Sequence, residues 1–144
     1  MKQRPWVVGL LWLGLLLSAF TGDTSPQAAS TATLIFYQRG SFANGSFRLV
    51  VNDQIVADPF LARTYFEVTV PAGNLTLRTI SDRFGEDSKR FTFTTAPGKT
   101  YYIEAIMDYD FMIRSLYLVQ REAQEALTRI KKLKRDEKAL QKVD

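Results

Sequence analysis

The sequence predicts a mainly β domain, an antiparallel sandwich of seven or eight strands followed by a C-terminal amphipathic α-helix. Two observations predict the sandwich. Short runs rich in branched and aromatic residues recur about every ten residues between residues 32 and 119, and turn-forming residues separate them. A third observation predicts the helix, because after residue 119 the apolar positions recur every three or four residues.

The first half of the domain contains four predicted strands. Phe47, Leu49 and Val51 fall on one face of their strand, and Arg48 falls on the other. The next two residues, Asn-Asp, tolerate a positive φ and predict a tight hairpin turn. The four predicted ranges are 32–39, 47–51, 54–57 and 63–70.

Four more strands are predicted in the second half. Phe91 and Phe93 alternate with Arg and Thr, which is typical of a strand with one buried face. Residues 71–74 and 96–99 contain Pro-Ala-Gly and Pro-Gly and predict turns, whereas residues 82–89 form a charged loop. The predicted ranges are 75–81, 90–95, 100–107 and 113–119.

Three of these strands carry apolar side chains on both faces, at residues 34–37, 101–103 and 116–119. A sandwich sheet needs only one apolar face, and a large exposed apolar patch usually marks a contact. Two alternatives remain for what covers this second apolar face. Either the C-terminal helix folds back onto this sheet, or it projects toward another chain and leaves the patch to a partner. The predicted contact residues are Ile35, Tyr37, Tyr102, Ile106, Tyr117, Ile130 and Leu133.

Residues 120–144 are predicted to form a basic amphipathic helix. Its apolar stripe is weakened by two alanines and interrupted by Glu137, with positions Val119, Ala123, Ala126, Ile130, Leu133, Glu137 and Leu140. A basic cluster on this helix either contacts anionic lipid headgroups or is a solvated helix end. Its members are Lys131, Lys132, Lys134 and Arg135.

Residues 1–20 are predicted to be an export signal or a weak N-terminal anchor, and residues 21–31 a linker or cleavage region. Lys2 and Arg4 precede an apolar run from Trp6 to Phe20, which is the arrangement of a secretory signal. As a helix this run would span roughly 22 Å, less than the roughly 30 Å of a bilayer core. We therefore expect an exported chain of the periplasm or cell envelope, with the run either cleaved or retained as an anchor.

The chain contains no cysteine and no histidine. Disulfides, thiolate nucleophiles, Ser-His-Asp triads and typical zinc or copper sites are therefore excluded. The loop acids Asp82, Glu86 and Asp87, and the pair Asp108 and Asp110, lack the spacing of a calcium loop, so solvated acids are the simpler interpretation. We predict no catalytic residue, no metal and no cofactor. Charges balance within the domain, which argues against a nucleic-acid partner.

Several stretches resemble, in the same order, a family of exported bacterial domains catalogued as domain of unknown function 2846. They are residues 32–37, 64–77, 96–103 and 116–119, the last running into an Ala/Glu-rich segment. The resemblance implies a small Ig-like or PEGA-like β-sandwich in the bacterial envelope and supplies no catalytic residue. Gln38-Arg39 departs from the family's usual Arg-Pro. Phe20 stands where many members carry a lipidated cysteine, so this chain is expected not to be lipidated.

These observations favour an exported, non-catalytic binding module of the cell envelope. Its expected partner is an envelope protein, or alternatively a glycan, bound through a sheet face or through the loops at one end. The alternative is a membrane-tethered accessory subunit, held by residues 6–20 and docking through its C-terminal helix. A small hydrolase is the third interpretation, and the missing histidine and cysteine disfavour it.

Overall fold

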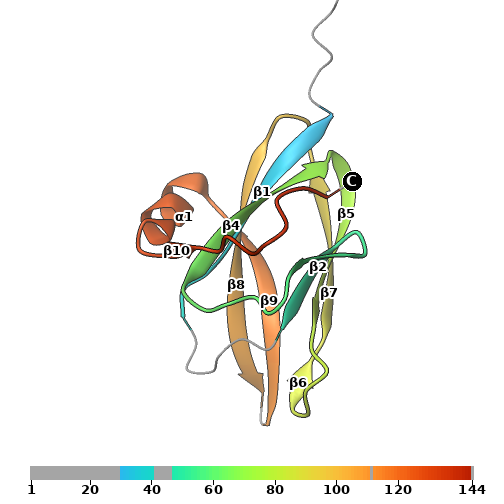
Figure 1. Ribbon diagram of the computed structural model, residues 1–144, viewed down its shortest axis with the longest axis vertical. Helices are drawn as coiled ribbons and strands as arrows, with labels where there is room; N and C mark the ends of the chain where they lie inside the picture. Colours follow the sequence, from blue (N-terminus) through green and yellow to red (C-terminus); the bar gives the residue numbers. More distant parts are fainter. Residues whose placement is uncertain (1–29, 41–46, 111, 144) are drawn as a thin grey trace, which may run out of the picture.

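A computed structural model of the chain describes residues 30–40, 47–110 and 112–143, which form a two-layer β structure (Figure 1). The larger sheet has the strand order β10-β4-β1-β8-β9-β6, and the smaller sheet has the order β3-β2-β5-β7. The larger sheet consists of β1 (Thr31–Gln38), β4 (Thr64–Pro71), β6 (Glu86–Asp87), β8 (Thr100–Asp110), β9 (Ile113–Arg121) and β10 (Lys134–Arg135). The smaller sheet consists of β2 (Arg48–Val51), β3 (Gln54–Ala57), β5 (Gly73–Ile80) and β7 (Lys89–Thr95).

The mainly β fold predicted from the sequence is confirmed. Each of the eight predicted strands coincides with an observed strand to within three residues at either end. The two-residue strands β6 and β10 were not predicted, because runs that short carry no periodicity. The predicted turn at Asn52 and Asp53 is also confirmed, since both residues have positive φ angles of 46° and 67°.

The purely antiparallel arrangement is wrong for the larger sheet. Strand β1 pairs antiparallel with β4 on one side but parallel with β8 on the other. The short strands β6 and β10 also pair parallel, with β9 and β4 respectively. Alternation reports which side chains share a face but not the direction in which a neighbouring strand runs, so the sequence could not reveal this mixture.

The main core lies between the two sheets and is built from their alternating apolar side chains. Phe36 and Phe66 face each other from adjacent strands, with ring centres 5.5 Å apart. Phe60 meets Phe66 edge-on at 5.2 Å. Each of these rings is at most 2% exposed, and burying a side chain of this kind contributes about 1.5–3 kcal/mol.

The predicted C-terminal helix of residues 120–144 is much too long. Helix α1 contains only eight residues, Ala123–Ile130, and the chain then turns, forms the short strand β10 and turns again. Ala139 and Val143, which follow the turn, are buried in the main core. A continued helix could not place them there, so tertiary burial outweighs a helical stripe that was already weakened by alanines and Glu137.

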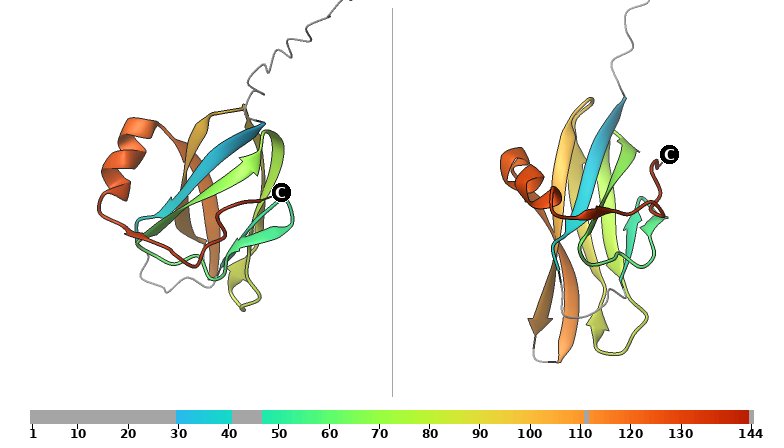
Figure 2. Two further views of the ribbon diagram at one scale, coloured as in Figure 1. Left: turned by 45° about the horizontal axis from the view of Figure 1, so that its top comes forward. Right: turned by 60° about the vertical axis from the view of Figure 1, so that its left-hand side comes forward.

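Residues 134–143 form a C-terminal strap that closes one side of the sandwich (Figure 2). The strap begins as β10 beside the start of β4, and further along Thr69 N–H donates to the Gln141 carbonyl at 2.8 Å. Val143 N–H donates back to the Thr69 carbonyl at 2.8 Å. On the smaller sheet, Leu140 N–H donates to the Val56 carbonyl of β3 at 2.9 Å. The strap thus covers the edge of β4, which would otherwise expose unpaired backbone groups.

The predicted export segment and most of the linker lie outside the described residues. Within residues 30–40, 47–110 and 112–143, no helix has the length and apolar character needed to cross a bilayer. Strand β1 starts at one end of the body, and β8 ends and β9 begins at the opposite end (Figure 1).

Candidate functional site: a basic groove beside helix α1

The outer face of the larger sheet carries a second, smaller apolar cluster beneath helix α1. Ile35 and Tyr37 of β1 are buried there against Ala126 and Ile130 of the helix. Tyr65, Tyr102 and Leu133 pack against this cluster and are partly buried. Five of the seven predicted contact residues therefore meet here, and the helix lies on its own sheet rather than projecting from it (Figure 2).

The other two predicted contact residues lie outside this cluster. Ile106 and Tyr117 are register partners on β8 and β9. Tyr117 is 37% exposed, and its ring meets Phe91 of the smaller sheet at 6.4 Å. Lys89 Nζ lies 5.5 Å from the centre of the Tyr117 ring. Tyr117 thus contributes to the contact between the two sheets and not to the surface under the helix.

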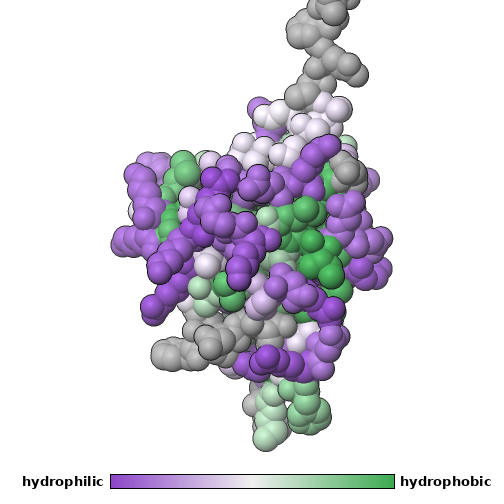
Figure 3. All heavy atoms as spheres, viewed as in Figure 1, coloured by the Kyte–Doolittle hydropathy of each residue, from purple (hydrophilic) through white to green (hydrophobic). Residues whose placement is uncertain are grey.

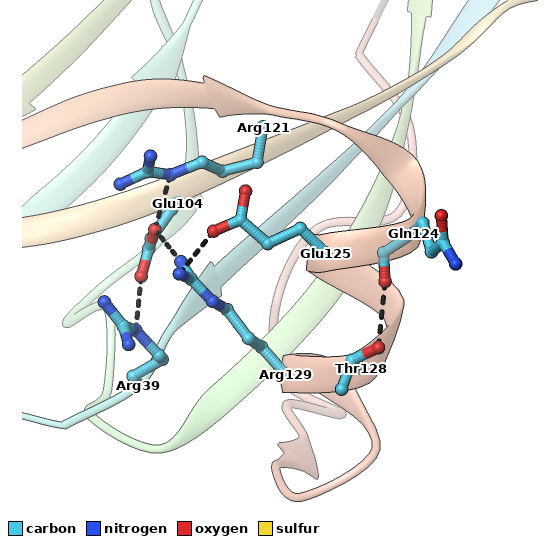
Figure 4. A network of polar contacts seen from close by, with 7 residues as sticks. All are labelled: Arg39, Glu104, Arg121, Gln124, Glu125, Thr128 and Arg129. Atoms are coloured by element: carbon cyan, nitrogen blue, oxygen red, sulfur yellow. Dashed lines mark hydrogen bonds and ion pairs between the residues drawn. The ribbon is translucent and has the colours of Figure 1, made fainter.

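A buried carboxylate forms the centre of the polar network next to this cluster (Figure 4). Glu104 of β8 is 1% exposed, and three guanidinium groups surround it. Arg39 Nε donates to Glu104 Oε1 at 2.5 Å. Arg121 Nε and Arg129 Nη1 both donate to Oε2, at 2.7 and 2.6 Å.

Each member of this network is positioned by a different element. Glu104 lies between the core residues Ile103 and Ala105, so strand alternation turns it to the outer face. Arg39 directly follows β1, Arg121 ends β9, and Arg129 lies in α1. A buried carboxylate is stable only when it is paired and hydrogen-bonded, so Glu104 ties the helix to two strand ends.

Arg129 also pairs with Glu125 one helical turn earlier, and it lies close to the Tyr37 hydroxyl. That hydroxyl is buried and has no partner in hydrogen-bonding geometry among the described residues. Burial raises the pKa of Tyr37 above its ordinary value of 10.0, and the Glu104 charge raises it further, while Arg129 partly opposes both. Tyr37 therefore stays neutral well into the alkaline range.

An open groove of about 460 Å³ lies beside the network, between the helix and the loops of the sheet. Its lining residues are Arg39, Arg63, Thr128, Arg129, Lys132 and Leu133. A neighbouring compartment of about 400 Å³ shares Arg39 and Arg63 and reaches Glu104 and Ile106. We call the two compartments together the basic groove.

Positive charge exceeds negative charge around the basic groove. The network residues Arg39, Arg121 and Arg129 are already paired, two of them with Glu104 alone. Arg63 and Lys132 are exposed and have no acidic partner within the described part of the chain. Four cations thus line the basic groove with a single carboxylate, Glu104, and the groove is poised to accept an anion.

The four residues of the predicted basic cluster do not share one helix face in the structure. Lys131 caps the C-terminus of α1, Lys132 follows in the turn, and Lys134 and Arg135 belong to β10. All four side chains are exposed, but of these only Lys132 lines the basic groove. Arg135 pairs instead with Glu67 at 3.6 Å. The expectation of one basic helix face is wrong because the helix ends at Ile130.

The loop acids Asp82, Glu86 and Asp87 form ion pairs with neighbouring basic residues. Glu86 is buried and binds Arg114. Asp82 pairs with Arg48, and Asp87 pairs with Lys89. Among the described residues, no group of three or more acidic side chains is placed to hold a metal ion.

Sequence reasoning missed Glu104 and the groove that surrounds it. One signal was present, because Glu104 is the single charged residue in the otherwise apolar or aromatic stretch from Tyr101 to Met107. A charge in such a strand must either face solvent or find cations, and residues of this type are almost never buried unpaired. The identity of those cations depended on the fold.

Comparisons with known proteins return no match, whether family models, curated proteins or solved structures are searched. The function proposed for this chain therefore rests on the basic groove and on the sequence.

Proposed function

We propose that this protein is a non-catalytic binding module of the cell envelope that holds a multiply charged anionic group in the basic groove. The observation that carries the proposal is the excess of cations there. Three guanidinium groups already occupy the carboxylate of Glu104, so it does not neutralise Arg63 or Lys132. These two cations line the groove and remain available to a ligand.

The residue types suit an anion with several oxygens. A guanidinium group offers paired donors that match phosphate and carboxylate, whereas lysine adds a mobile point charge. Arg39 and Arg63 line both compartments, so a ligand with two anionic groups could contact both compartments at once. Leu133 provides an apolar wall beside them.

Binding fits the site better than catalysis does. The chain has no histidine and no cysteine to act as a base or nucleophile near neutral pH. The one buried acid in the network, Glu104, has both carboxylate oxygens occupied by arginine donors and lines only the second compartment. A site of this kind recognises charge and does not transfer protons.

The envelope location is supported by the basic start and apolar run of residues 1–20, and by the resemblance to exported bacterial domains. The Ig-like or PEGA-like description belongs to the same proposal, supported by two stacked sheets of short strands. The alternative of docking through the C-terminal helix has less support, since its apolar residues Ala126 and Ile130 are buried against the chain's own sheet.

The test uses the full chain and pyrophosphate as a probe with several charged oxygens. Pyrophosphate is expected to raise the melting temperature, and this effect should weaken as salt screens the charges. The double variant Arg63→Ala/Lys132→Ala should lose most of the rise in melting temperature caused by pyrophosphate, because it removes the two unpaired cations of the groove.

The matched control is Lys131→Ala/Lys138→Ala, which removes two exposed charges outside the groove. It should respond to pyrophosphate like the unaltered chain. An equal loss in both double variants would reveal a nonspecific effect of net charge. That result, or no stabilisation of the unaltered chain at any salt concentration, would refute the groove as a binding site.

A further inference from the structure

The end of the body where β8 ends and β9 begins, beside the loop before β6, exposes large apolar side chains to solvent (Figure 3). Phe84 is fully exposed, with 106% of its reference surface accessible, and Met112 is 81% exposed. Tyr109 and Ile113 beside them are 56% and 50% exposed. We call these four side chains the apolar tip. It shares no residue with the basic groove and plays no part in the proposed anion binding.

Backbone pairing brings the two turns of the apolar tip together. Arg114 N–H donates to the Gly85 carbonyl at 2.7 Å, and β6 continues in parallel register along β9. A Cβ at Gly85 would lie 3.3 Å from the Met112 carbonyl oxygen, so the two turns are in contact. The backbone that carries Phe84 therefore lies next to the backbone that carries Met112, so both side chains belong to one end of the body.

The area of the apolar tip is small for a protein partner. At about 200 Å² for each large side chain, the exposed fractions of the four together correspond to roughly 600 Å². A stable protein–protein interface, including one with a second copy of this chain, buries about 800 Å² on each partner. A bilayer needs no complementary surface and accepts each protruding side chain singly, so the size and shape of the tip fit lipid better.

We propose that the apolar tip inserts into the interfacial region of a lipid bilayer. Phe84 and Met112 enter the acyl boundary, and Tyr109 suits the headgroup level, where one end of the ring is apolar and the other is wet. The tip lies at the end of the body opposite the start of β1 (Figure 1).

The charges around the tip predict the type of lipid. Asp87 is paired with Lys89, and the exposed residues Asp108, Asp110 and Arg83 leave the surroundings close to neutral. Anionic headgroups would gain little there, since attraction to them requires an excess of cations. Insertion should therefore depend on apolar burial and proceed equally well with zwitterionic vesicles.

The absence of cysteine allows a site-specific test in the full chain. A polarity-sensitive fluorophore is attached through Asp110→Cys at the tip or through Ala96→Cys at the opposite end; both positions are exposed. With phosphatidylcholine vesicles, the tip label should shift to the blue and be quenched by a lipid-borne quencher, whereas the Ala96 label should not. Adding anionic phosphatidylglycerol should change the response of the tip label little.

A pair of variants in the same loop tests whether the apolar side chains carry the contact. Phe84→Ser should weaken the vesicle response of the tip label about tenfold or more, because it removes the largest exposed apolar surface. Arg83→Ser, at the neighbouring exposed position, should leave it unchanged. Circular dichroism confirms that each labelled chain is folded.

Four outcomes would overturn the proposal. They are a tip label that ignores vesicles, equal responses of the two labels, a response that Phe84→Ser does not weaken, and a shift that depends on protein concentration without lipid. The last of these would indicate a second copy of the chain as the partner of the tip. None of these outcomes bears on anion binding, because the groove residues are unaltered in every variant.

Discussion

The inner face of the larger sheet packs apolar side chains against the smaller sheet, whereas its outer face buries a carboxylate among guanidinium groups beneath a short helix. On the inner face, Phe36, Phe66 and Val68 are at most 2% exposed and contact other apolar residues. On the outer face, Glu104 is equally buried but makes three charged hydrogen bonds.

The difference between these faces concerns specificity more than stability. Apolar burial is non-directional and tolerates changes in side-chain shape when total volume is preserved. A buried carboxylate with three donors accepts only one arrangement of the elements that carry them. We infer that the outer-face network determines where helix α1 lies, while the inner face supplies most of the stability.

The largest effect is expected on the inner face. Phe66→Ala should lower the free energy of unfolding by about 3–5 kcal/mol, because it leaves a cavity between Phe36 and Phe60. Urea denaturation followed by circular dichroism measures the change. If Phe66→Ala loses less unfolding free energy than the most destabilised outer-face variant, the proposed ranking of the two faces is wrong.

A smaller but still substantial effect is expected at Glu104. Glu104→Gln should cost about 2–3 kcal/mol, less than for a fully enclosed ion pair, since the arginine side chains remain partly exposed to water. Cleavage by trypsin after Arg129 should also become faster, because the helix loses its anchor. Glu125→Gln, which alters only the exposed partner of Arg129, should have a several-fold smaller effect. If both variants resist trypsin equally well, Glu104 does not hold helix α1 in place.

The apolar part of the outer face should contribute less than the network. Ile130→Ala is expected to lower the free energy of unfolding by about 1–2 kcal/mol, because Ile130 is 8% exposed at the end of a short helix. Leu127→Ala in the same helix should stay within about 0.5 kcal/mol of the unaltered chain, since Leu127 is 46% exposed. Thermal denaturation of both variants measures the difference, and equal losses would show that the helix packs differently.

The smallest effect concerns pH and the Tyr37 hydroxyl. Because burial raises the pKa of Tyr37 in the folded state, its contribution to stability is fully present below the ordinary value of 10.0 and is lost as the pH rises past it. Between about pH 8 and about pH 11, the unaltered chain should therefore lose more unfolding free energy than Tyr37→Phe does. Parallel slopes for the two chains would contradict an outer face that holds this hydroxyl neutral.

The strands of both sheets could be predicted because their signals are local. Alternation in β4 and β7, and the Pro-Ala-Gly and Pro-Gly turns near Ala72 and Gly98, depend only on neighbouring residues. The same reasoning identified Ile35 and Tyr37 as a second apolar face in need of a cover. It failed after Ile130, where a helical stripe competed with burial of Ala139 and Val143 in the main core.

The candidate site was less predictable than the strands. Lys132 was identified as a cation at a contact surface, but Arg39, Arg63 and Arg129 were not singled out. Nothing in the spacing of these residues predicts that they share a groove, since they belong to three separate segments of the chain. Glu104 could have been suspected from its apolar strand, yet its partners could not.

The sequence by itself determined the mainly β class, the positions of eight strands and the need for a cover on one outer face, because periodicity and turn chemistry are properties of adjacent residues. Only the tertiary structure decided the parallel pairing of β1 with β8, the early end of the helix and the basic groove. Arg39 is 65 residues from Glu104 and Arg129 is 25 residues from it. Hydrogen bonds across such separations form only after the strands and helix have been placed, so local patterns carry no trace of them.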